Sequence, residues 1–211
     1  MKALITGKSK LAGAIISRLH DTIVYKKLEI ESCRVEAEIP WKHFDIFINN
    51  ASVGFSQTDL LNEAFSEWRH DSNKLIINIG SRAGRPNISK GYLYGAQKAA
   101  LNHLADNLNY NSDRKCGIIT LNLGLVEHVE IPSLTYDEVV DCIENLIVDW
   151  YSGRAVMTNL TLEHRENYIE VQQYKKELKE IEEDFQMFTN NSLSLIHISE
   201  PTRPERISYA V

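Results

Sequence analysis

The sequence predicts an α/β fold with a doubly wound, mostly parallel sheet and an added C-terminal helix. Short apolar, β-branched runs alternate with amphipathic segments, as expected for strands and their crossover helices. Several of these runs end in Gly, Asn or Ser, where a buried strand opens into a loop. The 211 residues are 43% hydrophobic, which suffices for one domain with a core.

The composition limits the classes of function. A formal charge of −6 argues against nonspecific binding of nucleic acid or of an anionic membrane, because both reward a basic surface. Cys33, Cys116 and Cys142 lack the spacing of a disulfide framework or a zinc site. The sequence starts with Met1 and a strand-like run, without a signal-peptide pattern. We therefore expect a cytoplasmic protein without a metal site.

The N-terminal segment predicts an anion site. A strand at residues 2–6 leads into a glycine-containing turn and a helix at residues 14–20. Free backbone N–H groups and the positive end of a helix favour a bound pyrophosphate. The candidate residues are Gly7, Ser9, Lys10, Leu11 and Gly13. The alternative is an ordinary strand-to-helix connection.

Lysines follow the predicted second strand at residues 22–25. In dinucleotide-binding folds an acid at this point accepts the ribose 2′-hydroxyl, whereas a cation accommodates a 2′-phosphate. Lys26 and Lys27, with Lys10, favour NADP(H), and solvated surface lysines are the alternative. Residues 28–41 leave little room for a crossover helix, and a short third strand at 32–35 is one option.

Three side chains are expected to meet after the central strands. A strand at residues 75–79 ends in Gly80-Ser81, and Tyr94 and Lys98 lie four residues apart on the next helix, hence on one face. A phenol has an ordinary pKa near 10, and an adjacent ammonium favours its phenolate form. Tyr94 could then exchange a proton with a substrate oxygen, to which Ser81 hydrogen-bonds. A surface Tyr–Lys pair is the alternative.

Other segments flank this site. A strand at 44–48 leads into Asn49, Asn50 and Ala51, and a helix at 58–69 carries Asn62. A strand at 117–123 is followed by Gly124 and Val126, a helix at 136–150 and a last strand at 155–162.

The order of these motifs resembles the short-chain dehydrogenase/reductase family. Its glycine motif, Thr-Gly-x-x-x-Gly-x-Gly, is matched from Thr6 to Gly13 with Leu11 in place of the middle glycine. Asn49-Asn50-Ala51 resembles its Asn-Asn-Ala-Gly, with Ser52 as the fourth residue. Residues 122–126 resemble its Asn-Pro-Gly-x-Val without the proline.

The resemblance implies a Rossmann-type fold and reversible hydride transfer between NADP(H), or alternatively NAD(H), and a small carbonyl or alcohol. Tyr94 would be the acid/base, Lys98 would hold the nicotinamide ribose, and Ser81 would orient the substrate. Asn62 would complete a catalytic tetrad, and the backbone of Val126 would reach the nicotinamide. A homodimer or homotetramer is implied. A nucleotide-binding sensor or regulator with weak or no catalysis is the main alternative, and a scaffold without nucleotide is a third.

Residues 1–163 are expected to form the nucleotide-binding domain, and two further segments are expected to follow it. Residues 164–190 show apolar spacings of three and four, typical of a helix that packs on the domain. Residues 193–203, LSLIHISEPTR, resemble a translated sequencing adapter. We therefore expect residues 191–211 to be a non-native tail, with a real polar tail as the alternative.

Overall fold

The computed structural model describes residues 1–19, 24–28, 39–86, 91–154, 156–168, 176–177, 179–183 and 186–187. The chain divides into two compact units, Met1–Asn167 and Tyr168–Val211. In the second unit the described residues from 176 onward are helical, with i,i+4 ion pairs Lys176–Glu180 and Lys179–Glu183. No helix in the described ranges is both long enough and apolar enough to cross a membrane.

The first unit is built on a six-stranded sheet whose strand pairings are all parallel. The order is β2-β1-β3-β4-β5-β6, so the chain winds outward from β1 in both directions. The predicted doubly wound α/β fold is confirmed. The strands are β1 (Lys2–Thr6), β2 (Val24–Leu28), β3 (Ile46–Asn49), β4 (Leu75–Ser81), β5 (Gly117–Leu123) and β6 (Asn159–Leu162).

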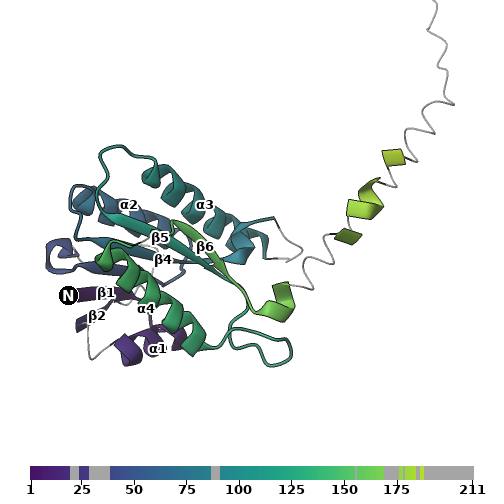
Figure 1. The fold of residues 1–211 in the computed structure, drawn as a ribbon, viewed down its shortest axis with the longest axis horizontal. Coiled ribbons are helices and arrows are strands. Elements are labelled where there is room, and N and C mark those ends of the chain that lie inside the picture. Colours follow the sequence, from purple (N-terminus) through teal and green to yellow (C-terminus); the bar gives the residue numbers. More distant parts are fainter. Residues whose placement is uncertain are drawn as a thin grey trace, which may run out of the picture. The chain divides into compact units, whose positions relative to one another are not determined.

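Helices cover both faces of the sheet (Figure 1). Alternate strand residues point to opposite faces, so one apolar cluster joins the sheet to α1 (Lys10–Leu19) and α4 (Tyr136–Ser152). A second cluster joins the other face to α2 (Ser56–Trp68) and α3 (Tyr92–Asn109). Strands buried on both faces are apolar throughout rather than alternating. Two short 3₁₀ helices, η1 (Trp41–His43) and η2 (Arg82–Gly84), lie in the connections.

The second strand differs from the prediction. Lys26 and Lys27 were expected to follow it, but they lie within β2, opposite Leu4 and Ile5 of β1. The pairing of β2 with β1 continues to Leu28 because backbone hydrogen bonds do not require apolar side chains. β2 is an edge strand of the sheet, and lysine is common on edge strands. The suggested third strand at 32–35 falls outside the described residues.

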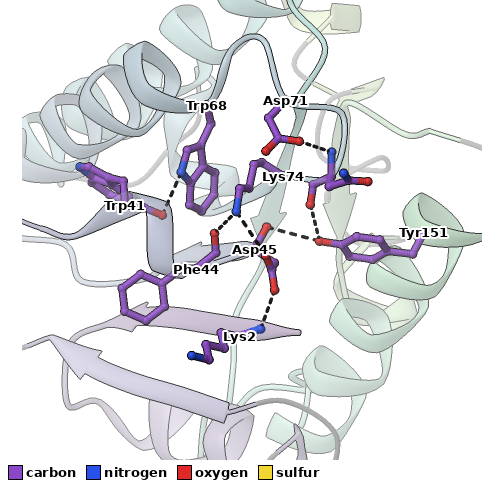
Figure 2. Close-up of polar contacts among 9 residues, drawn as sticks. Lys2, Trp41, Phe44, Asp45, Trp68, Asp71, Lys74 and Tyr151 are labelled. Carbon is purple, nitrogen blue, oxygen red and sulfur yellow. Dashed lines mark hydrogen bonds and ion pairs between the residues drawn. The ribbon is translucent and has the colours of Figure 1, made fainter.

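A polar cluster joins the amino ends of three strands (Figure 2). Lys74 Nζ donates to Phe44 O at 2.6 Å and Asp45 Oδ1 at 3.2 Å, and it lies 5.5 Å from the ring centroid of Trp68. Lys2 N donates to the other carboxylate oxygen of Asp45 at 2.9 Å. The hydroxyl of Tyr151 on α4 donates to Asn73 O at 3.0 Å. These contacts lie at the amino-terminal ends of the strands, whereas the predicted site residues lie at the carboxyl-terminal ends. Their role is therefore in stability.

Asp45→Asn should therefore reduce stability in a pH-dependent way. Burial raises the pKa of Asp45, but the hydrogen bond from Lys2 N–H and the Lys74 ammonium outweigh it, so the pKa is lowered. Such a carboxylate stabilises the fold above its unfolded pKa of about 3.9, and this contribution disappears as the pH falls through the folded pKa.

In urea unfolding, the variant should be less stable by roughly 0.5 to 1 kcal/mol at neutral pH, and the difference should close in acid. Asp113→Asn, at an exposed position in the loop between α3 and β5, is the control, because it lies outside the helix ends where a charge affects stability. A pH-independent difference would contradict the assignment.

Candidate active site

The glycine turn after β1 lies where the strand order reverses, between β1 and β3. Gly7 has φ 89°, and a Cβ there would lie 3.0 Å from Ala51 Cβ, so both backbone and space favour glycine. Asn50 Nδ2 donates to Thr6 O at 3.0 Å and Ser9 Oγ at 3.3 Å. The end of β3 thus holds the turn at the point where doubly wound sheets bind nucleotides.

The beginning of α1 continues this turn. Ser9 Oγ accepts a hydrogen bond from Ala12 N at 3.1 Å, as an N-cap does. Lys10 is exposed, whereas Leu11 is partly buried against the apolar cluster of α1 and α4. The side chain that replaces the middle glycine is therefore used in packing. A Cβ on Gly13 would meet no atom within 4 Å.

Ser81 lies close to the beginning of α3. It is the last residue of β4 and the N-cap of η2, where its Oγ accepts from Ala83 N at 3.2 Å. A Cβ on Gly95 would lie 2.9 Å from Ala83 O, so a glycine allows η2 to touch α3 beside Tyr94. The Tyr94 side chain is 44% exposed. Ser81 and Tyr94 thus border the same carboxyl-edge loop.

Lys98 lies one turn further along α3 and is buried, with 3% exposure. Its Nζ donates to Gln57 Oε1 at 2.5 Å and Ile79 O at 3.0 Å. The same nitrogen lies 5.5 Å from the ring centroid of Tyr94. Burial lowers the pKa of Lys98 to about 8, so the ammonium still predominates at neutral pH.

Buried amides continue from Lys98 across the sheet. Asn49 Nδ2 donates to Gln57 O at 2.8 Å and Asn78 Oδ1 at 3.0 Å. Asn78 Nδ2 in turn reaches Thr120 Oγ1 at 3.4 Å. Asn49, predicted to bind the cofactor, is therefore a fully buried brace of β3, β4 and α2.

The expected place of Asn62 in a catalytic tetrad stays a prediction, and the structure shows a different α2 residue in contact with Lys98. Asn62 is exposed on α2. Gln57 is instead the α2 residue that contacts Lys98. The sequence contained a signal for it: Gln57 precedes the buried Leu60, Leu61 and Ala64 by three, four and seven residues, the spacing of one helical face. Beginning the predicted helix at residue 58 hid this position.

A charged bridge crosses the carboxyl edge beside Ser81. Arg82, Gly124 and Glu163 follow the aligned ends of β4, β5 and β6. Arg82 Nη1 contacts Glu163 Oε2 at 2.5 Å, and the buried Glu163 carboxylate occupies the place where a Cβ on Gly124 would lie. Gly124 is thus required by close approach, while its N–H donates to Leu162 O at 2.8 Å.

The loop that begins at Val126 is closed at its base. Val126 forms an isolated bridge with Leu134, and Glu127 N donates to Leu134 O at 2.8 Å. Glu127 adopts the left-handed region, with φ 48°, and its carboxylate accepts from Tyr136 N at the beginning of α4. The chain from β5 to α4 is therefore short and anchored at both ends.

A shallow cavity of about 270 Å³ lies between the η2 loop and the beginning of α3. Its walls include Tyr92, Ala96 and Ala99, which occupy a different face of α3 from Tyr94 and Lys98. The cavity is therefore separate from the predicted catalytic residues.

Comparisons with known proteins identify the fold. No family model matches the sequence, and no curated protein matches it. Serine dehydrogenase from Escherichia coli has a TM-score of 0.58 and 17% identity, covering 77% of this chain and 97% of that chain. A short chain dehydrogenase from Burkholderia cenocepacia, in complex with NADP, has a TM-score of 0.61 and 17% identity, covering 85% and 95%.

An enoyl-[acyl-carrier-protein] reductase (NADH) from Aquifex aeolicus has a TM-score of 0.62 and 15% identity, covering 79% of this chain and 96% of that chain. The chain therefore has the Rossmann-type fold of the short-chain dehydrogenases/reductases, as its motifs predicted.

Gly124→Ala should destabilise the domain, because the methyl group must displace the Glu163 carboxylate. We expect a loss of about 1 to 3 kcal/mol in the free energy of unfolding, typical of overpacking. Gly13→Ala is the matched control: its methyl group meets open space within α1, and alanine favours a helix by roughly 0.5 to 1 kcal/mol. Denaturant unfolding of both variants tests this, and equal effects would refute the steric explanation.

Proposed function

We propose that the protein catalyses reversible hydride transfer between NADP(H) and a small carbonyl or alcohol substrate. The observation that carries this proposal is the placement of three groups at one sheet edge: Ser81 ends β4, and Tyr94 and Lys98 lie one turn apart on the helix against η2. The glycine turn after β1 opens at the same carboxyl edge. The fold supports the proposal, since the Burkholderia neighbour was solved with NADP.

The residues at the strand ends fit a dinucleotide. Gly7, Ser9 and the first turn of α1 would hold the pyrophosphate, since Gly7 lacks a side chain and the open space beside Gly13 lets a ligand approach. Ala51 would lie beside the adenosine ribose and the backbone of Gly124 and Val126 beside the nicotinamide. Lys98 would hold the nicotinamide ribose. When bound, the nicotinamide supplies or accepts the hydride.

Tyr94 would act as the acid and base. In reduction its hydroxyl donates a proton to the substrate oxygen as the carbonyl carbon gains the hydride, and in oxidation the phenolate takes that proton back. Lys98 would favour the phenolate through its nearby positive charge. Ser81 would hydrogen-bond the substrate oxygen while its charge changes.

We further propose a preference for NADPH over NADH. With Lys26 and Lys27 inside β2, the exposed Lys10 at the beginning of α1 is the main candidate for the 2′-phosphate, and Lys27 is one residue from the end of the strand register. A charge-assisted contact contributes roughly 1.5 to 3 kcal/mol, or about tenfold to a hundredfold in affinity.

Fluorescence titration should show this difference in Kd between NADPH and NADH. Lys10→Ala should reduce it, whereas Lys42→Ala, at an exposed position on η1, should not. Equal or tighter binding of NADH would reject the preference.

Tyr94→Phe should abolish most turnover. It removes the proton donor but keeps the ring, so kcat should fall roughly a hundredfold to ten-thousandfold with little change in NADPH affinity. The assay is NADPH oxidation with ketones and aldehydes found by screening the wild-type protein. Tyr92→Phe is the matched control, since Tyr92 lies on the same helix and is 80% exposed.

Lys98→Ala should weaken both turnover and cofactor binding, and Ser81→Ala should mainly lower turnover. Near-normal turnover of Tyr94→Phe would reject the site and favour a nucleotide-binding protein without catalysis.

A further inference from the structure

Gln57 has its side-chain amide enclosed between two strands and a helix. Its Nε2 donates to Asn49 O at 2.6 Å and Ile79 O at 3.1 Å, and its Oε1 accepts from Lys98 Nζ at 2.5 Å. A carbonyl oxygen in place of Nε2 would face two acceptors, so these partners fix which end of the amide meets Lys98. The residue is 4% exposed, which leaves it little freedom to turn.

Two neutral oxygens accept hydrogen bonds from the Lys98 ammonium. Gln57 Oε1 and Ile79 O account for two of its three N–H donors. The centroid of the Tyr94 ring lies 5.5 Å from the same nitrogen. One donor is therefore available for the ribose in the proposed complex.

Charged side chains on the elements around Lys98 have partners of their own. Glu63 of α2 accepts from Trp41 Nε1, Arg82 of η2 pairs with Glu163, and Asp106 of α3 accepts from Asn159. Asp59 of α2 is exposed, and the strand residues that face α3, Asn78, Thr120 and Asn122, are neutral. Burial is the cause of the lowered pKa of Lys98. Within the described residues, both hydrogen-bond partners of this lysine, the Gln57 amide and the Ile79 carbonyl, are thus uncharged.

We propose that Gln57 is a positioning residue, whose side-chain oxygen holds the Lys98 ammonium close to Tyr94 and directs it to the cofactor ribose. This inference rests on the proposed function. It assigns a role in the site to the first turn of α2, where the sequence predicted none. Because Gln57 is neutral, it places the ammonium without stabilising its charge as a carboxylate would. NADPH affinity should therefore fall as the pH rises through about 8, where Lys98 loses its proton.

The test is the Kd of NADPH, measured by fluorescence from about pH 6.5 to 10, which reports the ionisation of the free protein. Gln57→Glu places a carboxylate on the ammonium and should move the midpoint of the affinity loss upward by about one pH unit or more. Gln57→Met removes the acceptor at similar volume and should move it downward. Lys98→Met should bind weakly and without this pH dependence.

The control is Ser66→Asp, which adds the same charge to the exposed face of α2 and should leave the midpoint unchanged. A purely structural role for Gln57 would lower the Tm and reduce affinity at every pH without moving the midpoint. If Gln57→Glu does not fold, the downward shift of the pH midpoint in Gln57→Met tests the proposal by itself.

Two results would overturn the inference while leaving the proposed function standing: a wild-type Kd that is flat across this range, or an unchanged midpoint in the Gln57 variants. A wild-type protein that binds no NADPH at any pH would overturn the proposed function and this inference with it.

Discussion

The arrangement of the site depends on a row of buried amides beneath Lys98. Asn49 and Asn78 connect β3 and β4, and Gln57 connects both strands to α2 and α3. Buried polar groups that satisfy one another fix a single geometry, whereas an apolar core tolerates repacking. The ammonium therefore sits on a rigid support, and the same contacts set the position of α3 relative to the sheet.

This row marks a change in the character of one sheet face. Phe47, Ile76 and Ile118 pack against α2 and α3, but two residues later the same face carries Asn49, Asn78 and Thr120. The opposite face stays apolar up to Ile79, Leu121 and Leu123. On the face that α2 and α3 cover, the amino-terminal half of the strands thus contributes apolar packing to the core. The carboxyl-terminal half contributes hydrogen bonds that fix the geometry of the site.

The fold could be predicted because buried parallel strands leave continuous apolar runs, and those of β1 and β5 matched their bounds. Positions that depend on pairing were harder. The lysines of β2 are strand residues only because β1 supplies their partners. Gln57 was missed because a polar residue at a helix beginning resembles a loop until its contacts are known. Ser81, Tyr94 and Lys98 were predicted from their spacing together with the family-like order of the flanking motifs, whereas the burial of Lys98 required the packed structure.

The bridge from Arg82 over Gly124 to Glu163 has an evolutionary consequence. The carboxylate can cross the end of β5 only where that strand ends in a residue without a side chain. A larger residue at position 124 is compatible with the fold once position 163 becomes smaller or turns away, and Arg82 then loses its partner. Positions 82, 124 and 163, which are far apart in the sequence, are therefore expected to change together as the protein diverges. Because Arg82 follows Ser81 directly, such changes would also alter the η2 loop next to Ser81.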